Sequence, residues 1–234
     1  MNELERQAGP ADVAGAAEVA EVVGVAEAAG VIGPRAATGA RAERAVTEEE
    51  SRVLADRVRD ESGDSATYRR LIATEDHEEL ADVLGAPQHP LWAREIAAFR
   101  LGCAGDRRAF ETLVLLLNHR DAQRCLSASH ALAVLGDPRT PRAAAALATN
   151  VLRTAYALHP VRLLADLRAP ESVPALIATL ERLLAPNETH WRVALACVEG
   201  LGRLGDRRAL PLLRSARAHP RLSAAASEAL RRLG

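Results

Sequence analysis

Over the second half of the chain, apolar side chains recur every three or four residues in short, paired segments. The spacing predicts helix pairs over 90–104 with 109–118, 121–135 with 140–149, and 191–204 with 209–218. In the last pair the apolar positions are Ala194, Cys197, Val198 and Leu201, followed by Leu212, Leu213 and Ala216. Residues three and four apart share one face of an α-helix, so each segment has a face to bury. One further amphipathic helix is predicted over 220–233.

A polar turn of nearly constant composition joins the two helices of a pair. It reads Gly105-Asp106-Arg107-Arg108, then Leu135-Gly136-Asp137-Pro138-Arg139, then Leu204-Gly205-Asp206-Arg207-Arg208. Glycine supplies the left-handed conformation that ends a helix, and aspartate accepts hydrogen bonds from the free N–H groups that open the next one. The first two copies are 31 residues apart, and a period of that size is typical of a helical solenoid.

The third repeat departs from this pattern. Its turn reads Leu167-Arg168-Ala169-Pro170, so that Arg168-Ala169 replaces the Gly-Asp pair, and Glu171 takes the place of the basic residue. Pro160 falls inside its first predicted helix. Because an interior proline removes a backbone hydrogen bond and clashes with the preceding turn, we expect a kink there.

The first part of the chain divides into two segments. Residues 1–45 are rich in Ala, Gly, Val and Glu, with no aromatic residue, and they predict a disordered or loosely helical tail. Residues 46–86 predict an N-terminal helical cap on the array, which itself covers 87–234. In the cap, Thr47 and Glu50 have capping-box spacing, so a helix is expected to begin at Thr47, and a second one opens near Ser65.

Composition narrows the class of protein. Aromatic residues make up 3%, so small aliphatic side chains must build the core, which suits closely packed helices. The three cysteines have no C-x-x-C spacing, which argues against a disulfide framework or a zinc site. No stretch is long and apolar enough to span a membrane, and the start of the chain lacks the basic cluster of a signal peptide. We therefore expect a cytoplasmic protein that does not bind a membrane.

The repeats resemble HEAT repeats of the short, HEAT-like class first known from phycocyanobilin lyase subunits. That class carries the signature ALG-x-LGDPRA-x-PxLxxxL, which is similar to Glu199–Leu213 and to Ala131–Arg139. The resemblance covers residues 90–234 and implies an all-α, right-handed α-solenoid of helix pairs. It says little about function, because HEAT-like arrays serve as scaffolds, lyases, hydroxylases and DNA glycosylases.

Charge gives the strongest indication of a partner. Residues 1–89 hold 9 arginines against 19 acidic residues, a net charge of −10, whereas residues 90–234 carry +9. Several arginines recur at the repeat turns and form a predicted partner-binding edge: Arg107, Arg108, Arg139, Arg142, Arg207 and Arg208. Such an edge suits phosphate or carboxylate groups. Since Glu171 interrupts the row, the hypothesis favours a protein partner with spaced acidic groups, together with weak, salt-sensitive nucleic-acid binding.

Two other functions remain open. A nucleic-acid-binding array similar to HEAT-like alkylpurine DNA glycosylases would use the basic repeats and two residues able to stack on bases, Trp92 and Trp191. A lyase, or a subunit of one, rests on the family resemblance alone. The sequence contains no nucleophile elbow, phosphate-binding loop or dinucleotide fingerprint, and His77-Glu78 is a single His-Glu pair where a di-iron hydroxylase would need several. We therefore predict no catalytic residues, no metal and no cofactor.

Overall fold

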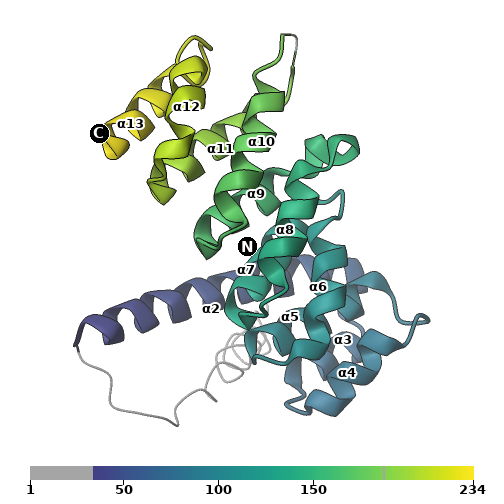
Figure 1. Cartoon of the computed structure of the whole chain (residues 1–234). Coiled ribbons are helices and arrows are strands. Elements are labelled where there is room, and N and C mark those ends of the chain that lie inside the picture. Colours follow the sequence, from purple (N-terminus) through teal and green to yellow (C-terminus); the bar gives the residue numbers. More distant parts are fainter. Residues whose placement is uncertain (1–33, 187) are drawn as a thin grey trace, which may run out of the picture. The chain divides into compact units, whose positions relative to one another are not determined.

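The computed structural model describes residues 34–186 and 188–234, and over these ranges the chain is helical without any strand (Figure 1). This confirms the all-α class. The described residues fall into two compact units, one ending at Ile96 and the other running from Ala97 to Gly234. The helix α5 (Leu91–Cys103) contains the boundary between them.

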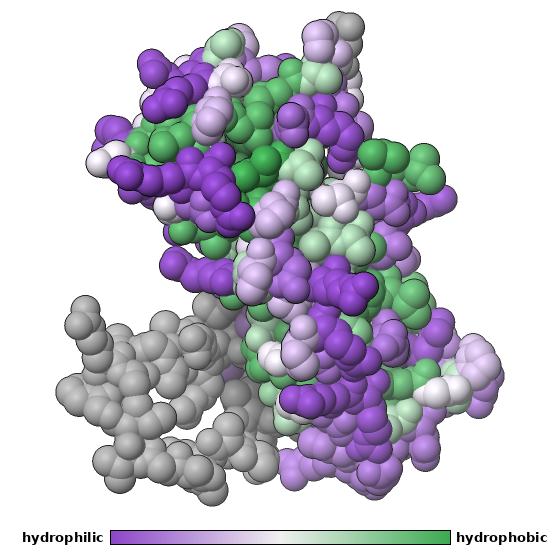
Figure 2. All heavy atoms as spheres, viewed as in Figure 1, coloured by the Kyte–Doolittle hydropathy of each residue, from purple (hydrophilic) through white to green (hydrophobic). Residues whose placement is uncertain are grey.

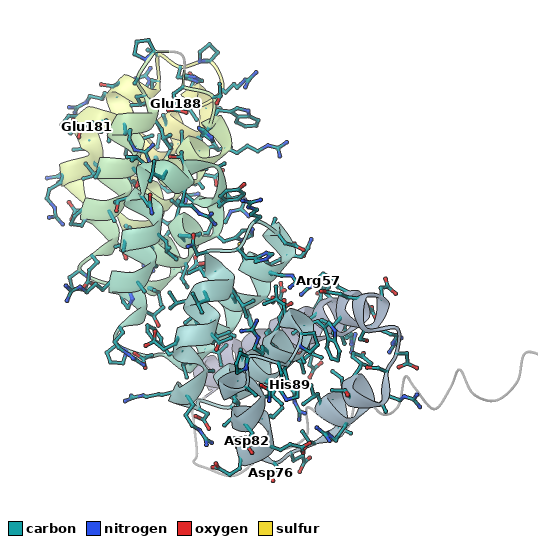
Figure 3. The ribbon with its side chains drawn as sticks, turned by 90° about the vertical axis from the view of Figure 1, so that its right-hand side faces the viewer. Arg57, Asp76, Asp82, His89, Glu181 and Glu188 are labelled. Atoms are coloured by element: carbon teal, nitrogen blue, oxygen red, sulfur yellow. The ribbon has the colours of Figure 1, made fainter. Side chains whose placement is uncertain are left out.

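The first unit consists of α2 (Pro34–Ser62), α3 (Ala66–Ala73), α4 (His77–Gly85) and the start of α5. The predicted opening of a helix at Ser65 is confirmed, because the Ser65 side chain accepts a hydrogen bond from the Tyr68 N–H group. The phenol of Tyr68 is buried and donates to the Ala55 carbonyl at 3.1 Å. Arg57 of α2, labelled in Figure 3, pairs with the buried Glu95 of α5. The core is otherwise aliphatic: Leu54, Val58, Leu71, Leu80, Val83 and Ile96.

The start expected at Thr47 is wrong. Helix α2 begins at Pro34 and runs without interruption through Thr47, so no helix begins there. Proline is well suited to the first position of a helix, and the residues that follow are mostly Ala, Arg and Glu, which favour helix over an N-cap conformation. Of the predicted tail, residues 34–45 belong to α2 and residues 1–33 lie outside the described residues. The boundaries at 45 and 86 stay predictions.

The second unit is built from stacked helix pairs. After the end of α5 come α6 (Phe110–Leu117), α7 (Ala122–Leu135), α8 (Thr140–Thr149), α9 (Leu158–Leu167), α10 (Ser172–Leu183), α11 (Trp191–Leu204), α12 (Leu210–Ala216) and α13 (Ser223–Leu233). Helices α7, α9, α11 and α13 pack one on the next in one layer, and α8, α10 and α12 do so in the other (Figure 1). Three short 3-10 segments, η1 (Arg107–Ala109), η2 (Val151–Tyr156) and η3 (Arg207–Ala209), complete the unit.

Small residues allow the helices of one layer to approach closely. A Cβ atom placed on Gly202 of α11 would lie 2.7 Å from the Cβ and 2.9 Å from the Cα of Ala229 on α13. Between the layers, leucines at equivalent positions are fully buried: Leu101, Leu132, Leu164 and Leu201. The core is therefore made of aliphatic side chains between closely spaced backbones, as the low aromatic content predicted.

The kink expected at Pro160 is also wrong. Helix α9 begins at Leu158, which places Pro160 in the first turn, where its missing N–H group has no intrahelical partner to lose. The distortion lies earlier, in η2, where Arg153 has φ −122° and ψ 16°. The irregularity of the third repeat is thus taken up before its first helix rather than inside it.

Candidate partner-binding site

The repeat turns have the chemistry that the sequence predicts. Gly105, Gly136 and Gly205 adopt φ values of 79°, 61° and 73°, the left-handed conformation that ends a helix. The carboxylate that follows each glycine accepts a hydrogen bond from the N–H group two residues later. These distances are 3.0 Å for Asp106 to Arg108, 2.9 Å for Asp137 to Arg139, and 2.8 Å for Asp206 to Arg208.

In each of these turns the same aspartate also binds the side chain of that arginine. The guanidinium of Arg108 donates through Nε at 3.1 Å and Nη2 at 2.7 Å, and Arg208 makes the equivalent bonds at 3.0 and 2.7 Å. Hydrogen bonds from Arg139 and Arg208 lower the pKa values of Asp137 and Asp206, and the aspartates raise the pKa values of those two arginines. These Asp–Arg pairs neutralise much of the predicted positive edge.

Arg139 makes contacts that reach the preceding repeat. Its Nη1 donates to Glu111 at 3.0 Å, and its guanidinium lies 3.9 Å from the ring centroid of Phe110. Both of these residues belong to α6. Arg139 therefore tethers one repeat to its neighbour.

The other three predicted arginines are placed differently. Arg107, Arg142 and Arg207 are exposed, and within the described ranges no carboxylate pairs with any of them. The charge of Arg107 contributes to lowering the pKa of Asp137 in the next turn, after the larger effect of Arg139. In this row, three arginines bind the aspartate of their own turn. The guanidinium groups of the other three are exposed and have no carboxylate partner among the described residues.

The third repeat interrupts the row as expected. Arg168 ends α9 in the left-handed conformation with φ 51°, and Glu171 is exposed at the start of α10 without a side-chain capping bond. The buried hydroxyl of Ser172 holds this turn by different bonds: it donates to the Leu164 carbonyl at 2.6 Å and accepts from the Ala169 N–H group at 3.1 Å. This turn therefore presents a carboxylate where the others present an arginine.

The remaining candidate groups are potential metal ligands, the cysteines and Trp191. No set of three potential metal ligands comes together in the described part of the chain. Burial raises the pKa values of the Cys103 and Cys197 thiols to about 12, so neither is a ready nucleophile. Trp191 lies under two guanidinium groups, those of Arg192 at 5.5 Å and Arg221 at 5.2 Å from its ring centroid. No helix among the described residues is long and apolar enough to cross a membrane.

The sequence reasoning missed a charged groove on the layer formed by α9, α11 and α13. It has a volume of about 520 Å³ and a floor of small residues that includes Ala196, Gly202 and Ala229. Its rim carries charges from each helix at i, i+4 spacing: Arg162 with Asp166, Glu199 with Arg203, and Glu228 with Arg232. Arg203 binds Asp166 at 2.7 Å and Arg232 binds Glu228 at 2.9 Å, so opposite charges largely satisfy one another. The i, i+4 spacing was the signal that could have revealed it.

Comparison with known proteins adds one finding to this geometry. Residues 193–219, which include α11 from its third residue, the Gly205-Asp206 turn and α12, match the family model described as PBS lyase HEAT-like repeat. No curated protein matches the chain. The matched segment has the same turn chemistry as the Asp106 and Asp137 turns, and the helices of this unit pack as stacked pairs. The match over residues 193–219 supports a HEAT-like repeat protein.

Proposed function

We propose that this protein is a non-enzymatic HEAT-like scaffold that binds an acidic protein partner along its turn edge. The turn edge consists of Arg107, Arg108, Arg139, Arg142, Arg207 and Arg208. The observation that carries the proposal is the exposure of Arg107, Arg142 and Arg207 without a carboxylate partner in the described ranges. Planar guanidinium groups on a rigid frame are well suited to bind carboxylates in a bidentate manner.

The arginines of the turn edge have two different functions in this proposal. Arg108, Arg139 and Arg208 hold the turns through their aspartates, so they position the edge rather than bind the partner. The exposed guanidinium groups of Arg107, Arg142 and Arg207 would bind the carboxylates of the partner. Glu171 would repel a continuous phosphate backbone at the third turn, whereas a protein with spaced acidic side chains can avoid it.

The test is co-purification of the partner from the native cell with the full chain as bait. The triple variant Arg107→Gln, Arg142→Gln and Arg207→Gln should lose the partner, as judged by quantitative mass spectrometry. A matched control, Arg162→Gln, Arg214→Gln and Arg217→Gln, removes the same charge from exposed arginines elsewhere in the array and should retain it. Loss with the control and retention with the turn-edge variant would refute the assignment of the surface.

A second arm addresses nucleic acid. Binding of labelled duplex DNA should be weak and should fade between about 50 and 200 mM salt, because only electrostatic contacts would hold it. Tight binding at the higher salt that is lost in the turn-edge variant would replace the protein partner by a nucleic acid.

A further inference from the structure

Large hydrophobic side chains are exposed on α6 and on η2. Among the described residues with large exposed apolar side chains are Leu115 (70% exposed) on α6, and Val151 (62%) and Leu152 (89%) on η2. Figure 2 shows hydrophobic side chains projecting from the surface over both elements. A single exposed leucine is ordinary, but Val151 and Leu152 are consecutive and both exposed, which is typical of a surface that is covered by something else.

The segment that carries Val151 and Leu152 is held firmly. Asn150 accepts a hydrogen bond from the Leu152 N–H group at 3.0 Å, and the Thr154 hydroxyl donates to the Val151 carbonyl at 3.0 Å. Arg182 of α10 in turn donates to that hydroxyl at 2.8 Å. The two apolar side chains are therefore presented on a fixed backbone, so a ligand would not have to pay the full entropic cost of ordering it.

Arginines surround the same place. Arg153 donates from Nε to the Asn118 side chain at 3.0 Å and stacks over Tyr156, with 4.6 Å from guanidinium carbon to ring centroid. The contact joins η2 to the end of α6, three residues beyond Leu115. Burial is the main cause that lowers the pKa of His119. The positive charges of Arg124, Arg120 and Arg153 lower this pKa further, and Asp121 opposes them. Three cations thus act on one loop.

We name as the loop patch Arg120, Val151, Leu152 and Arg153. It lies at the opposite end of α7 from the turn edge, because the 118–121 loop precedes Ala122 whereas the Asp137 turn follows Leu135. Fourteen helical residues separate the two surfaces, a distance of about 20 Å at 1.5 Å per residue. Two carboxylates that Figure 3 labels, Glu181 and Glu188, belong to α10 and the following loop.

We propose that the loop patch docks an acidic, amphipathic segment of a protein partner, with its apolar side chains on Val151 and Leu152 and its carboxylates on Arg120 and Arg153. The proposal rests on the scaffold function and adds a second surface to it. Apolar contact alone would accept many ligands, and the arginines restrict the choice to segments that also carry negative charge. A hydrophobic centre with cations at its rim is the arrangement of ordinary protein interfaces.

The test uses a phage-displayed library of random peptides of about 15 residues, selected on the immobilised full chain. Enriched peptides should combine Asp or Glu with Leu, Ile, Phe or Trp. In fluorescence anisotropy they should bind the Leu152→Ser and Arg120→Glu variants about tenfold or more weakly than the parent chain, as expected for loss of an interface anchor. Val134→Ser, which removes a 45% exposed residue from α7, is the matched control and should bind normally.

Three results would overturn the proposal: no enrichment, enrichment of peptides that lack acidic residues, or unchanged binding by Leu152→Ser. Vesicles of phosphatidylcholine with phosphatidylserine provide a further arm. Sedimentation of the chain with them that is lost in Leu152→Ser would assign the loop patch to a membrane surface instead. Loss of peptide binding in Leu152→Ser but not in the Arg107, Arg142 and Arg207 variant separates this surface from the turn edge, so the two proposals fail independently.

Discussion

The regular repeats and the third repeat make the same corner with different chemistry. In the repeat of α7 and α8, Gly136 takes the left-handed conformation and Asp137 binds both the Arg139 backbone and its guanidinium. In the repeat of α9 and α10, Arg168 takes that conformation with φ 51°, and Ser172 supplies the bonds from inside the turn. The corner is a requirement of stacked helix pairs, and the glycine and aspartate are one way of meeting it.

The difference also separates stability from recognition. The Asp106 and Asp206 turns are held by an Asp–Arg pair in which the arginine is exposed. Each of these two turns also carries a second exposed arginine without a described carboxylate partner. The third turn uses a buried hydroxyl, so its surface is free to carry Glu171. The repeats can therefore be alike in fold while differing in the charge that they present to a partner.

The largest losses of stability are expected at the buried leucines, which the regular repeats and the third repeat share. Leu164 of α9 and Leu201 of α11 occupy equivalent, fully buried positions. Replacing either by Ala should lower the free energy of unfolding by about 2–5 kcal/mol, because methyl groups are lost and a cavity remains. Urea denaturation measures both. A loss below about 0.5 kcal/mol at either position would mean that the alignment of the third repeat with the others is incorrect.

The capping groups should give the next largest effect. Ser172→Ala leaves the Ala169 N–H group without its 3.1 Å partner in a buried turn, and we expect a loss of about 1–3 kcal/mol. Asp137→Ala removes an N-cap from the regular turn and should cost about 0.5–2 kcal/mol. Hydrogen exchange of α10 and α8 shows whether each loss is local. Equal protection of the Ala169 N–H group in the parent and Ser172→Ala chains would mean that the serine does not hold this turn.

The regular repeats could be predicted closely from the sequence, because glycine, aspartate and helical spacing act locally. Trp191–Leu204 and Ala122–Leu135 form helices within a residue or two of the predicted bounds. The function of Ser172 was not predictable, because its bond to Leu164 spans eight residues and depends on the fold of the turn. The pairing of Arg108 and Arg208 with their own aspartates could not be predicted for a similar reason. An arginine side chain can adopt many conformations, and only the folded turn selects one of them.

Exchanging the left-handed residues should shift stability in opposite directions. The left-handed conformation costs a non-glycine residue about 1–2 kcal/mol, and Arg168→Gly removes this cost. Because glycine also raises the conformational entropy of the unfolded chain, we expect the free energy of unfolding to rise by only up to about 1 kcal/mol. Gly205→Ala imposes the same strain on a regular turn, where a Cβ meets nothing within 4 Å, and should lose about 1 kcal/mol. Thermal melts of the two variants test the pair. A destabilised Arg168→Gly chain would show that the arginine side chain has a structural function of its own.

The smallest effect concerns acid. Because hydrogen bonds from Arg139 and Arg208 lower the pKa values of Asp137 and Asp206 in the folded chain, these aspartates stabilise the fold above the ordinary carboxylate pKa. That contribution is lost as the pH falls through the lowered values. Asp137→Asn with Asp206→Asn should therefore flatten the decline of stability in acid, measured by urea denaturation at successive pH values below about 5. Arg139→Gln with Arg208→Gln should flatten it in part, because the backbone N–H bonds to the two carboxylates remain. Adding these changes to the two asparagine changes should not flatten it further, since the carboxylates are then already gone. Additive effects would mean that the aspartates owe their low pKa values to the helix ends and not to the arginines.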